Sequence, residues 1–189
     1  MENIKQFQNK IDSAIKELDI TQIINSATSF PISCSDLDEG YDNSKALNSK
    51  LNDIKPYLST VYWFEITPVD PKELTKRIDR LRQEGKYKVP PTNQKNISDN
   101  ILYVGKVRKN FRGRVLQHLG YRSPATWSLQ LRHWSKDLIP NLNISIHYIQ
   151  FSEGENYPPF AEEIENISLA ILEQRVAEKL KPILGKHSL

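Results

Sequence analysis

The sequence predicts an α+β domain in which a small three-stranded sheet, antiparallel in type, is flanked by helices and preceded by a helical extension. Three short segments are dense in β-branched and aromatic residues, as strands are: 60–66, 101–105 and 143–151. Longer segments around them repeat apolar residues at helical spacing. The resulting order of helices and strands suits one sheet covered by helices.

The first 57 residues are expected to form the helical extension. Residues 2–19 carry apolar side chains at helical spacing, and residues 46–54 can form a short helix ahead of Pro56. Between these segments, residues 28–45 are rich in Ser, Asp, Gly and Asn, which predicts a loop.

The main domain is expected to occupy residues 58–189. The first strand stops at Pro68, and the next helix has Pro71 near its start and Gly85 as its stop. Residues 86–100 contain prolines and several asparagines, and we interpret them as a loop.

The second half of the chain also carries helix boundary signals. Asn110 can cap a helix over 111–119, which Gly120 can end. A further helix is predicted over 125–137. A long helix of about 161–180 follows the third strand and closes before a proline.

Composition indicates one soluble globular domain. The chain has 189 residues, of which 38% are apolar and 26% are charged. No apolar run approaches the roughly 18 residues of a membrane span, and we see no secretory signal, so no membrane partner is expected. The single cysteine, Cys34, excludes an internal disulfide and a cysteine-built zinc site and favours a reducing cytoplasm.

Positive charge is concentrated in residues 101–136. This window has no Asp or Glu and contains eight bases: Lys106, Arg108, Lys109, Arg112, Arg114, Arg122, Arg132 and Lys136. Residues 1–60, by contrast, hold nine acids and six bases. A local field of one sign suits a polyanion such as nucleic acid, whereas the alternative is a solvated helical face.

One pair of residues indicates chemistry on phosphate, and one acidic residue on the last helix needs a separate explanation. Arg114 and His118 lie four residues apart, which places them on one face of the expected helix. A guanidinium can hold phosphoryl oxygens and an imidazole can move a proton near neutral pH, although both could simply face solvent. Glu173 interrupts an apolar stripe on the last helix, so it needs an arginine, a hydrogen-bond cluster or a metal ion as a partner, or it lies on the rim of the stripe.

The order of these motifs resembles the GIY-YIG nuclease family over residues 58–186. The matching segments are VYWFEI, LYVGK, the Arg114–His118 helix and LEQRVAEKLKP. The resemblance places Tyr62 and Tyr103 at the two motif tyrosines. It places Glu173 at the metal ligand, nine residues ahead of Pro182 as in many members.

Three departures from the family pattern are visible. The glycine of the first motif is absent, because Thr60 and Val61 precede Tyr62. The two tyrosines are 41 residues apart, so residues 68–100 read as an insertion. Gly185 stands where many members have an asparagine.

The resemblance implies a Mg²⁺-dependent endonuclease, with Mn²⁺ as a substitute ion, that hydrolyses DNA phosphodiester bonds. Glu173 would hold the ion and Arg114 would offset phosphoryl charge. Tyr62 or His118 would take a proton from the attacking water, and Tyr103 would orient that water or the phosphate. The expected contacts to backbone phosphate are Lys106, Arg108, Lys109 and Arg112.

If the protein is a nuclease, a self-contained enzyme of this size suits a restriction endonuclease, which often acts as a homodimer on a palindrome.

Two further functional classes stay open at this point. The first alternative is a non-catalytic DNA-binding protein on the same scaffold. The second is a protein whose basic stretch binds an acidic partner protein.

Overall fold

The computed structural model describes residues 13, 19–38, 45–139, 142–151 and 161–185. It is an α+β fold, but its antiparallel sheet has four strands rather than the three predicted. The helix expected over 2–19 falls almost wholly outside the described residues. No described helix combines the length and apolar character that crossing a bilayer requires.

The strands are β1 (Thr28–Ile32), β2 (Ser59–Ile66), β3 (Ile101–Val107) and β4 (Ile144–Phe151), arranged in the order β1-β4-β2-β3. β2 pairs with both β3 and β4, so every residue of β2 except Glu65 is buried. This position explains the continuous apolar character of β2. A strand covered on both faces has no polar face.

The loop expected over 28–45 is the main error in the fold prediction. Its first residues form β1 at the edge of the sheet, where Phe30 lies opposite Ile146 and Ile32 opposite Ile144. Pro31 lowers the strand signal, yet an edge strand tolerates a proline because one side of its backbone has no neighbouring strand. A short helix, α3 (Cys34–Asp38), follows directly.

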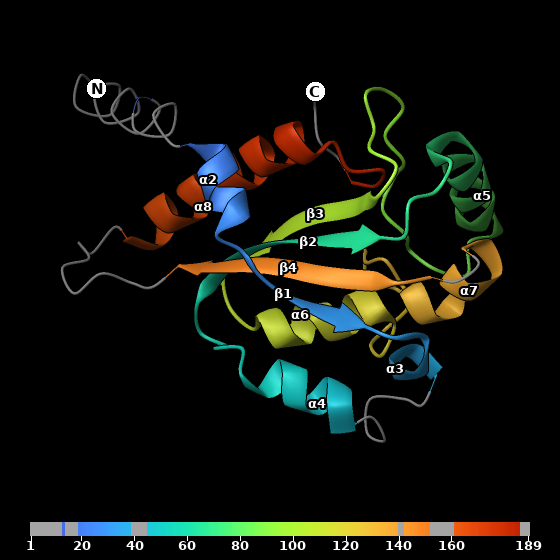
Figure 1. Cartoon of the computed structure of the whole chain (residues 1–189), viewed down its shortest axis with the longest axis horizontal. Helices are drawn as coiled ribbons and strands as arrows, with labels where there is room; N and C mark the ends of the chain where they lie inside the picture. Colours follow the sequence, from blue (N-terminus) through green and yellow to red (C-terminus); the bar gives the residue numbers. More distant parts are fainter. Residues whose placement is uncertain (1–12, 14–18, 39–44, 140–141, 152–160, 186–189) are drawn as a thin grey trace.

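Helices cover both faces of the sheet (Figure 1). One face packs against α8 (Ala161–Leu180) and α2 (Ile20–Asn25). The other face packs against α6 (Phe111–Leu119) and α4 (Lys45–Asn52). Successive β2 side chains alternate accordingly: Val61 and Trp63 join the α8 cluster, whereas Tyr62 and Phe64 join the α6 cluster.

Several predicted helix boundaries are confirmed. α5 (Pro71–Glu84) starts behind Asp70, whose carboxylate accepts from the Lys72 and Glu73 amides, and ends at Gly85 in the left-handed region. α6 starts behind Asn110, whose side chain accepts from the Gly113 amide. α8 ends at Leu180, as predicted.

The helix expected over 125–137 is wrong. Residues 121–130 instead form a loop that folds back on α6, and only η1 (Leu131–His133) and α7 (Ser135–Leu138) are helical. Gln130 ends the loop in the left-handed region at φ 55°. Long-range bonds from the loop to α6 override its local helical rhythm.

The predicted insertion and the chain after α8 lie together beside β3. The amides of Ile183 and Leu184 donate to the carbonyls of Ile101 and Leu102 at 2.8 and 2.9 Å, which covers the outer edge of β3. Asn93 in turn donates to Ile183. Residues 91–93 are therefore tied to the same sheet edge as Tyr103.

Candidate functional site

Tyr62 lies at the centre of the predicted site. It is fully buried on β2, opposite Gly105 of β3, with its ring on the α6 face. Its hydroxyl lies 2.9 Å from His118 Nε2, and Arg114 Nε donates to it at 3.1 Å. Tyr62, predicted on a strand, is therefore hydrogen-bonded directly to Arg114 and His118, both predicted on a helix.

α6 presents Arg114 and His118 from one face, one helical turn apart. Arg114 is half-buried and bonds with both phenols, Tyr62 and Tyr103. Its Nη1 also donates to Gln117 Oε1 at 2.8 Å. The guanidinium is thus held in a fixed orientation while part of it still reaches solvent.

His118 is fully buried and engaged at both ring nitrogens. The Leu129 amide donates to Nδ1 at 3.1 Å, so the neutral ring carries its proton on Nε2 and donates to the Tyr62 hydroxyl. Burial, with Arg114 nearby, holds the pKa of His118 well below its usual value. The imidazole is therefore neutral and acts on Tyr62 rather than on solvent.

Tyr103 is the more accessible of the two phenols. It lies opposite Phe64 on β3, and its ring centroid is 6.2 Å from that of Tyr62 and 4.9 Å from that of His118. Most of its side chain is buried, but a part stays exposed to solvent. Of the two tyrosines, Tyr103 is the one that a bound molecule could reach.

Gly105 allows both phenols to occupy this position. A Cβ there would lie 2.5 Å from Tyr103 Cε1 and 2.7 Å from the Tyr62 hydroxyl oxygen. Both distances are far inside van der Waals contact. The glycine that follows Tyr103 and Val104 is thus needed for space beside the strand.

Both phenols are protonated at neutral pH. Burial is the largest cause that raises the pKa of Tyr62 well above its usual value, and it likewise raises the pKa of Tyr103. Arg114 opposes this shift at both residues, whereas the Glu173 carboxylate adds to it. Glu173 is therefore near enough to act electrostatically on both hydroxyls.

Glu173 itself has a different direct partner. It extends from α8 and bonds through Oε2 to Lys106 Nζ at 2.5 Å. Lys106 follows Gly105 on β3, so its side chain leaves the strand on the α8 face. The structure thus places Glu173 in an ion pair with a residue predicted to bind DNA, on the α8 face of the sheet, whereas Tyr62 and Tyr103 lie on the α6 face.

The donors present fit a Mg²⁺ ion held largely by phosphate and water. The Glu173 side chain keeps 19% of its surface exposed, and only one of its oxygens is used by Lys106. The described residues contain no group of three or more His, Cys, Asp or Glu side chains that would make a protein cage. A bound ion would therefore either share the Glu173 carboxylate with Lys106 or displace the Lys106 ammonium group from it.

The other predicted phosphate contacts lie around the start of α6. Lys109 is exposed and Arg108 is half-exposed in the connection between β3 and α6. Arg112 donates to the Asn52 side chain of α4 at 2.8 Å. These cations lie in the connection that precedes α6 and in its first turn, ahead of Arg114 and His118 on the same helix.

Sequence reasoning missed two supports of the site. Gln117 holds the guanidinium of Arg114, and its position three residues along the same helix was the available signal. The Leu129 amide holds His118, and no sequence pattern could reveal it because the donor is a backbone group in a loop.

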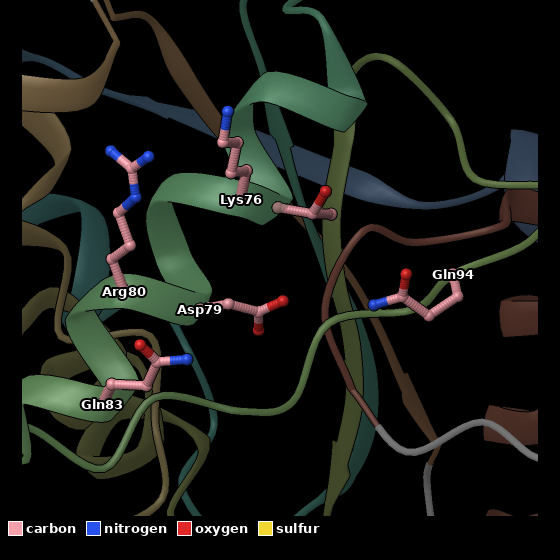
Figure 2. A pocket seen from close by; sticks show the side chains of 6 residues that line it. Lys76, Asp79, Arg80, Gln83 and Gln94 are labelled. Atoms are coloured by element: carbon pink, nitrogen blue, oxygen red, sulfur yellow. The ribbon is translucent and has the colours of Figure 1, made fainter.

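A separate polar hollow lies beside α5, within the predicted insertion (Figure 2). Asp79 and Gln94 point toward one another across it, and Asp79 accepts from the Thr92 hydroxyl at 3.0 Å. None of the predicted site residues lines this hollow. It is therefore distinct from the Tyr62 network.

Comparison of the chain with protein-family models, with curated proteins and with solved structures finds no match.

Proposed function

We propose that the protein is a metal-dependent endonuclease of the GIY-YIG type that hydrolyses DNA phosphodiester bonds, with restriction as its setting. One observation carries the proposal. Tyr62, Tyr103, Arg114 and His118, expected from separate motifs, lie in one hydrogen-bonded network, and Glu173 acts on its phenols. A cytoplasmic location and action as a homodimer on DNA are part of the same proposal.

Arg114 and Tyr103 are assigned to the substrate because they combine network contacts with access to solvent. Arg114 binds the phosphoryl oxygens and offsets the charge that develops on them. Tyr103 orients the phosphate or the attacking water. A Mg²⁺ ion at Glu173 would supply charge stabilisation to the phosphate and the leaving oxygen.

Tyr62 is the stronger of the two candidate bases, and because it is fully buried it would receive the proton of the attacking water through Tyr103, whose hydroxyl bonds with it. His118 has both ring nitrogens in use, so it has no lone pair to offer. At Tyr62, Arg114 Nε and His118 Nε2 both point at the hydroxyl oxygen and would hold a phenolate. Because burial keeps its pKa high, the cleavage rate should increase with pH above neutrality.

The test is cleavage of supercoiled plasmid with Mg²⁺ or Mn²⁺. We expect Arg114→Ala and Glu173→Ala to lose at least about 100-fold in rate, the scale of removing one charge-stabilising group. Glu178→Gln is the matched control, since Glu178 lies on the same helix but bonds with Gln174 and Arg175. Equal cutting by wild type and both alanine variants would reject the assignments.

A non-catalytic DNA-binding protein is the second candidate. The observation in its favour is the ion pair between Lys106 Nζ and Glu173 Oε2 at 2.5 Å. Because Lys106 already balances the charge of Glu173, the carboxylate does not need a metal ion. This candidate predicts salt-sensitive DNA binding without cleavage under any metal condition. Absence of DNA binding at low salt would instead favour an acidic protein partner.

A further inference from the structure

We propose that the 121–130 loop is a second DNA contact, in which Trp127 stacks on a nucleobase beside the candidate site. The inference rests on the proposed function, since DNA is the ligand. Trp127 is 54% exposed, whereas Trp63 and Trp134 are 3% and 2% exposed. An exposed indole offers a large apolar surface, and every base has a face on which it can stack.

The loop that carries Trp127 is held firmly. Its neighbour Ser128 is buried, and the Ser128 hydroxyl donates to the Gln117 carbonyl at 3.0 Å. The buried Gln130 amide donates to the carbonyls of Ser123 and Thr126 and to the Ser128 hydroxyl. Because the loop is already ordered, little conformational entropy is lost when the indole binds a ligand.

The same bonds place the loop next to the Tyr62 network. Ser128 binds the backbone of Gln117, whose side chain holds Arg114, and Leu129 binds His118. Trp127 therefore precedes residues that bond to the last turn of α6, which follows the turn that presents the guanidinium. In this proposal, a DNA strand whose phosphate lies at Arg114 extends a neighbouring nucleotide to Trp127.

The segments that flank the 121–130 loop or bond to it carry aromatic and cationic side chains. The Tyr87 ring stacks on His133 with centroids 4.7 Å apart, and Arg132 lies 5.1 Å from the centre of the Tyr121 ring. Flat rings and guanidinium planes at a surface are the groups on which bases stack.

Two acid-free segments meet at this loop. The Lys88 amide donates to the Pro124 carbonyl and the Ser128 amide donates to the Lys88 carbonyl, each at 3.1 Å. Residues 86–98 and 100–136, which these bonds join, contain no Asp or Glu. Lys86, Lys88 and Arg122 have exposed side chains. This charge favours a negatively charged partner over a neutral protein, and the exposed indole favours nucleic acid among such partners.

The experiment follows Trp127 emission during titration with DNA in the absence of divalent metal. The probes are a 20-base-pair duplex and the same duplex with a four-nucleotide unpaired bulge. Because the two other tryptophans are buried, we expect iodide to quench Trp127 in the free protein and DNA to change its emission. Both responses should disappear in Trp127→Phe.

Affinity measured by fluorescence anisotropy of labelled DNA provides the second readout. Trp127→Ala should weaken binding by about 5- to 150-fold, the range for stacking on one base, and should leave the salt dependence unchanged. Ile167→Ala is the matched control, because Ile167 is 52% exposed on α8, on the other side of the sheet. It should bind as wild type does.

The outcomes separate this inference from the nuclease proposal. Trp127-dependent binding without cleavage supports the inference and rejects the nuclease. Wild-type affinity in Trp127→Ala overturns the inference and leaves the nuclease proposal standing. A change from dimer to monomer in Trp127→Ala without any change in DNA affinity also overturns it, since the indole would then contact a second copy.

Discussion

The His118 side chain contacts Tyr62 and a loop backbone group rather than solvent. Its ring is fully buried, with a backbone donor on Nδ1 and the Tyr62 hydroxyl at Nε2. The imidazole therefore fixes the position of the phenol and the direction from which the phenol oxygen is approached. Arg114 completes this arrangement from the preceding turn of α6.

Acidification should destabilise the protein through His118. Its pKa is low in the folded protein and about 6.5 in the unfolded chain, so the unfolded chain binds the proton first as pH falls. The stabilising contribution is complete above about pH 6.5. It decreases below that value by up to about 1.4 kcal/mol per pH unit, until the folded-state pKa is reached.

Urea unfolding at pH 8, 6 and 5 measures this effect. The pH dependence should be shallower in His118→Gln than in wild type, even if the variant starts less stable. His133→Gln is the control: partial burial lowers the pKa of His133 as well, but its side chain stays largely exposed to solvent, so its removal should change the slope less. Parallel curves for wild type and His118→Gln would contradict the prediction.

Among the elements, the register of β2 and β3 is what assembles the phenols. Tyr62 lies opposite Gly105, and Phe64 lies opposite Tyr103. A slip of one residue would turn every side chain of one strand to the other face. The pairing thus places both phenols on the α6 face, and Gly105 gives them room.

Gly105→Ala should test this arrangement. The added methyl group would lie against both phenols, so we expect a loss of stability of about 1–3 kcal/mol, the usual scale for overpacking. Chemical denaturation provides the measurement. Lys109→Ala, at an exposed position after the same strand, should change stability by no more than about 0.5 kcal/mol.

A displaced tyrosine pair should also disturb the Arg114 network in the Gly105→Ala variant. Cleavage, where present, should therefore fall more than the fraction of folded protein does. A variant as stable and as active as wild type would mean that the close packing of the two phenols against Gly105 is needed for neither stability nor activity.

For the whole molecule, the distribution of charge matters more than the net charge of +3. The basic window runs from β3 through α6 and the loop that carries Trp127. These elements lie at the site, whereas the acidic excess lies in the first 60 residues. This asymmetry predicts DNA binding that depends strongly on salt.

Salt titration gives the corresponding prediction. Plots of log affinity against log salt should be linear, and Lys109→Ala and Arg122→Ala should each reduce the slope by about 0.9, the value for one lost phosphate contact. Lys179→Ala, an exposed lysine on α8, should leave the slope unchanged. Affinity independent of salt would show that phosphate contacts do not dominate binding.

The sequence by itself determined most elements and the residues worth examining. α6 and α8 follow the expected bounds because caps, stops and apolar spacing are local signals. Arg114 and Glu173 could be selected because their chemistry and spacing are visible in the chain, and Tyr62 because the order of motifs resembles the GIY-YIG family.

Only the tertiary structure decided how those residues are used. β1 joins the sheet through β4, the 121–130 loop replaces a helix by bonding to α6, and Glu173 meets Lys106 across 67 residues of sequence. Each depends on partners far along the chain. A local pattern therefore contains no information about them, and the burial that makes His118 neutral follows from the same long-range packing.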